Sequence, residues 1–481
     1  MSGPVAIPTP PAGWRGREVR PADFAVAFIC LLGALHAIFV TPINADASFI
    51  LRQAKAQAEG FVPCRDIYCE YTPLVTTILA GVAGAIVPSI LLVQIALLMS
   101  ALLTYRLART LGNEEATAVR MAVVTWAVLL ASEGRSLVTE PFALICLLGA
   151  ANSFAASGAA PSGSFRAGIW IAAGFWAKQY ALLGWVGLVA AALWSRRFAS
   201  AAALTAGTLG GVSFGFLLLL ALGAEPSAFS SLFEVSAYPR SPMISNLLGA
   251  PDLLGALILT FLTLRLPDLR PADRRALRVP FLMALAALLP FVFRGYRHYW
   301  QFVLPFLVVL LLRPLPRPAP VWIRGPRHVA VMLLALGVGL DLSRCMGDLL
   351  LQTRESQRLA AVQLRAHTKG SAAPLYLADP ALLTWLQAPI LALRQVGPKF
   401  TRFSRSESDA LLAEAQIVVW DTSVPGADEL LNQLEADPWS ELALRGFVRT
   451  RVDGPIQVFS RPSMSSLADS WQDVGGTGGG S

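Results

Sequence analysis

The sequence FAVAFICLLGALHAIFV, residues 24–40, is followed by Thr41-Pro42-Ile43-Asn44-Ala45-Asp46. The first stretch contains no Asp, Glu, Lys or Arg, and about 17 apolar residues suffice for an α-helix to cross the hydrocarbon core of a bilayer. A carboxylate is unfavourable inside lipid, so Asp46 should lie at the membrane surface. We therefore predict that residues 24–40 form a first membrane span, retained because no clean signal-peptide cleavage site follows, and that an external loop begins at Asn44.

The composition extends this prediction to most of the chain. Of the 481 residues, 55% are hydrophobic and only 15% are charged, and the mean hydropathy is +0.56. Soluble domains carry about a quarter charged residues. The net charge of +8 comes from Arg residues clustered between apolar runs without interleaved aromatic residues. This pattern indicates a polytopic membrane protein with cytoplasmic Arg-rich loops, and argues against a nucleic-acid partner.

The positions of the Arg clusters set the predicted topology. The clusters at 195–197, 265–278 and 313–328 should be cytoplasmic, as should the N-terminus. Parity then allows one crossing within 73–110, so we expect 73–88 to be a re-entrant or interfacial helix. About eleven transmembrane helices result, at 24–40, 90–110, 115–131, 139–157, 167–178, 180–195, 198–222, 249–265, 279–294, 299–313 and 329–346.

The chain after the last predicted span changes character at about Arg354, where it becomes charged and alternating. Strands are expected at 374–377, 417–420, 447–451 and 456–460, and helices at 406–414 and 427–435. We predict an all-α membrane body with a small extracytoplasmic α/β domain. The expected organisation is a cytoplasmic tail (1–22), a multispan body (23–346) with its first external loop at 44–72, the α/β domain (347–462) and a flexible tail (463–481).

The sequence lacks several motifs of soluble enzymes. It contains no phosphate-binding glycine loop, HExxH, GxSxG or paired CxxC motif, which excludes the common soluble-enzyme mechanisms and ATP-driven transport. The remaining candidates are ionisable residues at the external membrane face. Cys64 and Cys69 lie in the same predicted external loop and are equally compatible with a disulfide bond or with two free thiols.

The first external loop carries the most informative pattern. Asp46 follows the first span, and the loop ends in Tyr71-Thr72-Pro73-Leu74. This arrangement, with the multispan body and the C-terminal domain, resembles the GT-C superfamily of glycosyltransferases, in particular the protein O-mannosyltransferase and aminoarabinose transferase branch. The resemblance implies a polyprenyl-phosphate-linked sugar donor, a glycan, lipid or protein acceptor, and transfer on the periplasmic side of the inner membrane. It implies no cofactor and leaves a divalent metal open.

Two acidic residues are candidate catalytic groups. By the resemblance, Asp46 corresponds to the general base that takes the proton of the acceptor hydroxyl. The alternative is that Asp46, or else Ser48, caps a helix over residues 47–59. The family's second acidic position falls near Glu133 and Glu140, of which Glu140 matches better although the family more often has Asp there. The equally weighted alternative is that Glu140 interacts only with a helix dipole.

Cationic residues at the external face are candidate ligands of the donor phosphate. Lys178 lies in a Lys-Gln pair similar to one in the family, and Arg294, Arg297 and His298 lie in a turn that resembles its Arg-His-Tyr phrase. The alternatives are snorkelling for Lys178 and lipid-headgroup binding for the turn. Residues of the first loop that could contact substrate are Arg52, Lys55, Arg65 and Tyr71.

Two other functions compete with a glycosyltransferase. A transporter or flippase of lipid-linked sugars would favour inverted repeats and interrupted spans in matching halves, and the sequence shows neither. A non-catalytic cell-envelope assembly subunit would tolerate the loss of Asp46, which is present. We therefore predict a membrane glycosyltransferase.

Overall fold

The structure of the protein is a computed structural model of the chain. It describes residues 21–41, 43–66, 72–134, 137–224, 226, 229, 258, 271–294, 299–313, 354–366, 374–377, 382, 385, 412–413, 415–421, 442–453 and 456–461. The statements below concern this part of the chain. The predicted spans at 249–265 and 329–346, the helices expected at 406–414 and 427–435, and the two tails lie outside it or almost entirely so.

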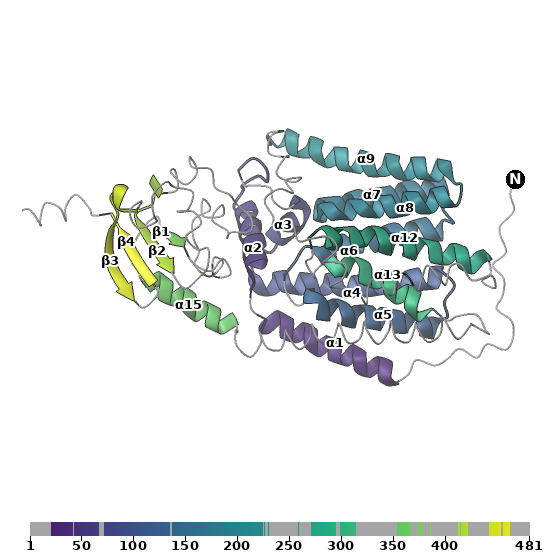
Figure 1. The fold of residues 1–481 in the computed structure, drawn as a ribbon, viewed down its shortest axis with the longest axis horizontal. Helices are drawn as coiled ribbons and strands as arrows, with labels where there is room; N and C mark the ends of the chain where they lie inside the picture. Colours follow the sequence, from purple (N-terminus) through teal and green to yellow (C-terminus); the bar gives the residue numbers. More distant parts are fainter. Residues whose placement is uncertain are drawn as a thin grey trace, which may run out of the picture.

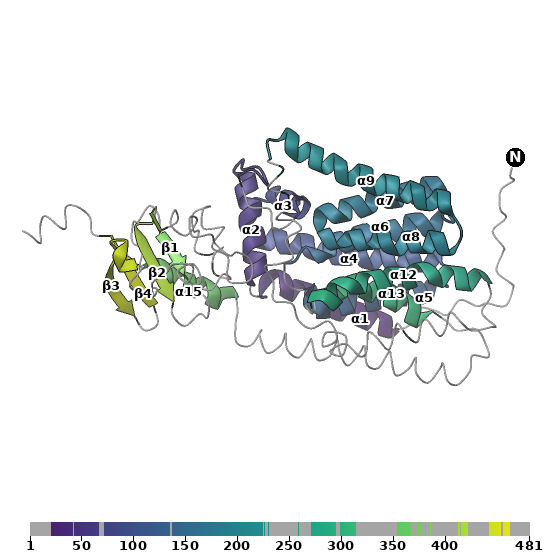
Figure 2. The same ribbon diagram turned by 45° about the horizontal axis from the view of Figure 1, so that its top comes forward.

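The body is a bundle of long helices that run side by side (Figures 1 and 2). Their apolar sequences leave no water-exposed stripe, as expected of helices surrounded by lipid and by one another. Buried side chains from the helices form one continuous apolar core. The bundle helices are α1 (Pro21–Phe39), α4 (Ile86–Thr110), α5 (Glu115–Leu129), α6 (Glu140–Ala156), α7 (Pro161–Ala177), α8 (Leu183–Trp194), α9 (Phe198–Ala221), α12 (Pro271–Arg294) and α13 (Trp300–Leu312).

Four of the described helices are long and apolar enough to cross a membrane: α1, α4, α9 and the helix that continues α5 to Ser132. Shorter apolar helices occupy 140–156, 179–194, 277–292 and 300–312. These helices coincide with predicted spans, although several boundaries differ. Helix α7 begins at Pro161, earlier than the expected 167, because proline is well tolerated in the first turn of a helix. The total of eleven spans stays a prediction.

Two helices of the first loop lie at one end of the bundle. Helix α2 (Ala45–Ala58) crosses the ends of the bundle helices, and α3 (Pro73–Ala80) lies beside it (Figures 1 and 2). We call this the α2 end. Eight residues of helix extend only about 12 Å, which is too short to cross a membrane. After α1, the next helix long enough to run the length of the bundle is therefore α4. This agrees with the prediction of one crossing within residues 73–110.

Glycine fixes the position of α2 on the turn before α4. Gly84 has φ of +62°, and a Cβ there would lie 2.5 Å from the Leu51 carbonyl oxygen. Side chains add to this contact, because the Gln57 amide donates to the Thr76 hydroxyl at 2.6 Å and accepts from the Thr77 hydroxyl at 2.8 Å. Helices α2 and α3 thus form one packed unit.

Small residues also set the close packing of α7 against α9. A Cβ at Gly168 would lie 2.3 Å from the Leu204 carbonyl oxygen, and one at Gly207 would lie 2.4 Å from the Phe165 carbonyl oxygen. Close backbone approach of this kind provides dispersion contacts where lipid supplies no hydrophobic driving force.

Polar contacts at the opposite end of the bundle involve Arg residues. Arg120 of α5 forms an ion pair with Asp23 of α1 at 3.3 Å, and Arg313 donates to the Leu111 carbonyl at 2.9 Å. The turn between α8 and α9 at this end also contains Arg196 and Arg197. The described Arg-rich turns therefore share one end, and the α2 end is opposite.

The C-terminal part contains a helix and a four-stranded sheet beyond the α2 end (Figures 1 and 2). Helix α15 (Arg354–Ala366) precedes β1 (Pro374–Leu377), β2 (Ile417–Asp421), β3 (Val448–Asp453) and β4 (Ile456–Ser460). The order is β1-β2-β4-β3, with β1 and β2 parallel and the other pairs antiparallel. The strands lie where the sequence predicts them, and β3 and β4 form the expected hairpin with an irregular register between Arg449 and Arg451.

Candidate functional site

The first turn of α2 carries Asp46, the predicted base. Helix α2 begins at Ala45, and the Asn44 side chain is its N-cap, accepting a hydrogen bond from the Ala47 amide at 2.7 Å. The expectation that Asp46 or Ser48 caps this helix is therefore wrong, because Asn44 already satisfies that free N–H group. Asp46 is the second helical residue, and its side chain lies outside the described part.

The two cationic residues that we singled out on α2 differ in environment. Arg52 is half-buried, and burial lowers the pKa of its guanidinium to about 10, with a small opposing effect from Glu59. Lys55 is exposed and forms an ion pair with Glu59 at 3.9 Å. Arg52 therefore remains a candidate for contact with an anionic group, whereas Lys55 faces solvent.

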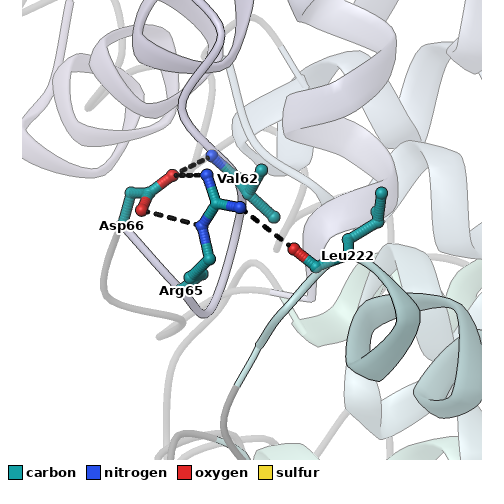
Figure 3. A network of polar contacts seen from close by, with 4 residues as sticks. All are labelled: Val62, Arg65, Asp66 and Leu222. Carbon is teal, nitrogen blue, oxygen red and sulfur yellow. Dashed lines mark hydrogen bonds and ion pairs between the residues drawn. The ribbon is translucent and has the colours of Figure 1, made fainter.

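The later part of the first loop is tied to the end of α9 (Figure 3). The Arg65 guanidinium donates to both carboxylate oxygens of Asp66, at 2.9 and 2.8 Å, and to the Leu222 carbonyl at 3.2 Å. Asp66 also accepts from the Val62 amide at 2.7 Å. The hydrogen bond from Arg65 is the main reason that the pKa of Asp66 lies below its usual value. Arg65 thus has a structural role in addition to its predicted contact with substrate.

Cys64 lies in the same loop and is disulfide-bonded, whereas Cys30 and Cys146 are free and buried. The other two cysteines, Cys69 and Cys345, lie outside the described residues. A bond between Cys64 and Cys69 stays a prediction. Tyr71 also lies outside the described part.

A buried ion pair joins two residues that the sequence suggested separately. Lys178, directly after α7, lies with its Nζ atom 3.2 Å from Oε1 of Glu140, the first residue of α6. The Lys178 side chain is 9% exposed and that of Glu140 is 2% exposed. Glu140 therefore interacts with a fixed cation in addition to the N-terminus of its helix, and part of the positive charge of Lys178 is neutralised within the protein.

The turn between α5 and α6 has an unusual backbone. Residues Leu130–Gly134 form a π-helical turn, a feature frequent at functional sites. The Gln301 side chain is fully buried and donates from Nε2 to the Ser132 carbonyl at 2.5 Å. The side chain of Glu133 lies outside the described part. Sequence reasoning missed this contact, because a single Gln in an apolar helix has no local partner to indicate it.

An aromatic pair brings the two predicted cationic segments together. Tyr180, two residues after Lys178, packs edge-on against Tyr299 with ring centroids 5.1 Å apart. Tyr299 directly follows the turn that contains Arg297 and His298. That turn lies outside the described residues, as does the side chain of Arg294, so the predicted convergence of these groups on one anion stays a prediction.

No group of three or more potential metal ligands is found among the described residues. The candidate groups that the structure describes at the α2 end include carboxylates, cations and aromatic rings. In general, a carboxylate can accept a proton from a hydroxyl, and an ammonium or guanidinium group can bind a phosphate.

Comparisons with known proteins identify the fold. No protein-family model matches the chain, and no characterised protein matches it by sequence. Among solved structures, ArnT from Cupriavidus metallidurans bound to undecaprenyl phosphate is similar, with a TM-score of 0.59, 16% identity, and coverage of 92% of this chain and 98% of ArnT. The Archaeoglobus fulgidus oligosaccharyltransferase in the apo form matches with a TM-score of 0.51 and 11% identity, over 88% of this chain and 72% of that protein.

A further structure, the oligosaccharyltransferase AglB from Archaeoglobus fulgidus in complex with an inhibitory peptide and a dolichol-phosphate, has a TM-score of 0.50 and 10% identity. It covers 92% of this chain and 74% of AglB. These likenesses show that the chain shares its fold with ArnT and with the oligosaccharyltransferase, both of which have the GT-C fold. The predicted fold relationship is confirmed.

Proposed function

We propose that the protein is a membrane glycosyltransferase that moves a sugar from a polyprenyl-phosphate donor to an acceptor hydroxyl at the α2 end of the bundle. We further propose that the α2 end is extracytoplasmic, that the membrane is the inner membrane, and that the acceptor is a glycan, lipid or protein. The observation that carries the proposal is the likeness to ArnT over 92% of this chain, since that protein is described with undecaprenyl phosphate bound.

The local arrangement supports the same function. Helix α2 with Asp46, the buried Lys178–Glu140 pair and the start of α13 lie at the same end of the bundle, because the end of α7 packs against Cys64 of the first loop and Tyr180 packs against Tyr299. Helical periodicity places position 46 on the same face of α2 as Ile50 and Gln53, which are both buried. A carboxylate at a membrane surface, near fixed cations, is suited to a reaction between a hydroxyl and a lipid phosphate ester.

The reaction requires one proton transfer and one displacement. The acceptor oxygen attacks the anomeric carbon while Asp46 takes the hydroxyl proton, and a new glycosidic bond forms. The bond between the anomeric carbon and the phosphate oxygen breaks, and its electrons leave with the polyprenyl phosphate. Attack opposite the leaving group inverts the configuration. No redox partner or cofactor is needed for this balance.

The leaving phosphate gains charge, so cations near it lower the barrier. We assign this role to Lys178 with Arg294, Arg297 and His298. An ammonium group has three N–H donors, so Lys178 can bind Glu140 and a phosphate oxygen at once. In this arrangement Glu140 orients Lys178, which is a more specific role than the catalytic partner of Asp46 that the sequence suggested.

The test uses purified protein and radiolabelled polyprenyl-phosphate sugars, and follows loss of label from the lipid. Asp46→Asn should fold and bind donor normally but reduce turnover at least about 100-fold, the range for loss of a general base. The matched control is Glu59→Gln, which neutralises an exposed carboxylate of the same loop. Near wild-type turnover in Asp46→Asn would overturn the assignment of the base. Movement of intact lipid-linked sugar from one leaflet of a vesicle membrane to the other, without loss of label from the lipid, would favour a flippase.

A further inference from the structure

The C-terminal part of the chain caps the first helix of the bundle. The Arg354 guanidinium is buried and donates to the Ile38 carbonyl at 2.6 Å, to the Ala37 carbonyl at 2.9 Å, and to the Thr41 carbonyl at 2.9 and 3.1 Å. The last carbonyls of a helix have no partner within the helix. Arg354 therefore satisfies the C-terminal carbonyls of α1 from more than 300 residues away in the sequence.

Gln357, one turn after Arg354 on the buried face of α15, contacts the residue that leads into α2. Its Oε1 accepts from the Ile43 amide at 2.9 Å, and its Nε2 donates to the Ile43 carbonyl at 2.7 Å. Both side chains are largely buried, with Gln357 8% exposed and Ile43 2% exposed. One amide side chain thus pairs with both polar backbone groups of a single residue.

These contacts determine where α2 begins. Ile43 precedes Asn44, the N-cap whose side chain accepts from the Ala47 amide. Asp46 lies within this short capped segment, three residues after Ile43. A shift of Ile43 would therefore move the backbone that carries Asp46, and a displacement of about 1 Å can reduce catalysis 100-fold.

Helix α15 is fixed at its other end too. Ala361 and Leu364 pack in one apolar cluster with Val419 of the sheet. Arg365 donates to the backbone carbonyl of Trp385. The side chain of Trp385 packs against this cluster and against the bundle core. Helix α15 therefore forms a rigid connection between the sheet and the segment that precedes Asp46.

We propose that Arg354 and Gln357 are positioning residues, which hold the α1–α2 turn so that Asp46 reaches the acceptor hydroxyl. This inference rests on the proposed function. It gives the C-terminal part a direct effect on turnover, separate from any contact that it makes with the acceptor. Donor binding should not depend on these two residues, because the assigned phosphate ligands lie directly after α7, at the end of α12 and between α12 and α13.

The main test is Gln357→Met, which keeps side-chain length and removes both hydrogen bonds to Ile43. We expect turnover to fall about 10- to 100-fold, with the donor KM and the affinity for a non-hydrolysable polyprenyl-phosphate analogue within twofold of wild type. Amide exchange of residues 43–47 should become faster. The control is Arg358→Met, on the exposed face of the same helix, where Arg358 forms an ion pair with Glu355 one turn earlier. This control variant should leave turnover, donor KM, analogue affinity and amide exchange unchanged.

A second variant keeps the inference falsifiable if Gln357→Met folds poorly. Gln357→Glu can accept from the Ile43 amide but cannot donate to the Ile43 carbonyl while it is ionised. Its turnover relative to wild type at the same pH should therefore be low at neutral pH and rise at lower pH, where the carboxyl is protonated; the ratio corrects for protonation of Asp46, which slows both proteins. Equal turnover in wild type and Gln357→Met would overturn the inference alone, as would a loss of donor affinity equal to the loss of turnover. A wild-type protein without transfer from any donor would overturn the proposed function and this inference with it, even if the exchange data still showed the contact.

Discussion

The buried pair of Lys178 and Glu140 allows a quantitative prediction. The two charged atoms lie 3.2 Å apart, with the side chains 9% and 2% exposed. At an effective dielectric constant of about 20 their attraction is about 5 kcal/mol. Desolvation of both groups offsets much of this attraction, so the pair as a whole contributes little more than an apolar pair would. Removal of one partner has a larger effect, because it leaves the other charge buried alone.

We therefore predict that Lys178→Met lowers the free energy of unfolding by about 3 kcal/mol, at the lower end of the range for a broken buried pair. The lower end applies because Glu140 begins α6, and the positive end of the helix dipole partly compensates its charge. Glu140→Gln should lower the free energy of unfolding by less, because the Lys178 side chain left without its partner is longer and more exposed than that of Glu140. The double variant should be more stable than the sum of the single effects predicts, with a coupling energy of about 2 kcal/mol.

The assay is denaturant unfolding in detergent for wild type, both single variants and the double variant, with donor-analogue binding measured on each. Lys178→Met should also weaken analogue binding, whereas Glu140→Gln should leave it unchanged or strengthen it, because a free ammonium binds phosphate better than a paired one. Additive unfolding energies would refute the coupling. A larger loss of turnover in Glu140→Gln than in Lys178→Met would instead favour a direct catalytic role for Glu140.

Three further predictions concern the first loop and the topology. Gly84→Ala should lower turnover and stability together, because its Cβ would lie 2.5 Å from the Leu51 carbonyl oxygen and displace α2; normal activity and thermal stability of this variant would contradict the packing. The hydrogen bond from Arg65 is the main reason that the pKa of Asp66 lies below its ordinary value of 3.8. The Arg65–Asp66 contact should therefore stabilise the loop fully above pH 3.8 and weaken as the pH falls below it. Protease cleavage within 60–66 should accordingly rise in acid, and Asp66→Asn should remove this pH dependence. Reporters fused after Arg275 and Glu414 should be active in the cytoplasm and outside it, respectively, and an inverted result at either position would reverse the proposed orientation.

Much of the helical body could be predicted from the sequence, because lipid imposes a simple requirement on each span separately. Hydropathy located the apolar helices, and parity identified 73–88 as a segment that does not cross, in agreement with the short α3. The strands were also predictable from local alternation. Helix boundaries were less predictable. The sequence placed the start of α2 after Asp46, because Asp and Ser are good N-caps, whereas in the structure Asn44 is the N-cap and accepts from the Ala47 amide.

Pairings between distant residues could not be predicted. Glu140 and Lys178 were each notable as charges near apolar runs, but their contact depends on how α6 packs against α7. Gln301 meets Ser132 across 169 residues, and Gln357 meets Ile43 across 314 residues. Each of these polar residues is unremarkable within its own segment, and only the packed bundle supplies its partner.

The contact between Arg354 and the end of α1 also has a consequence for the order in which the protein matures. A membrane protein is synthesised from its N-terminus, so the α1–α2 turn leaves the ribosome more than 300 residues before the side chain that caps it. Until then, water is the available partner for the carbonyls of Ala37 and Ile38 at the membrane surface. A nascent or truncated chain can thus contain every residue assigned to the chemistry and still lack the fixed geometry of α2. Full activity should appear only when α15 has folded back onto the end of α1.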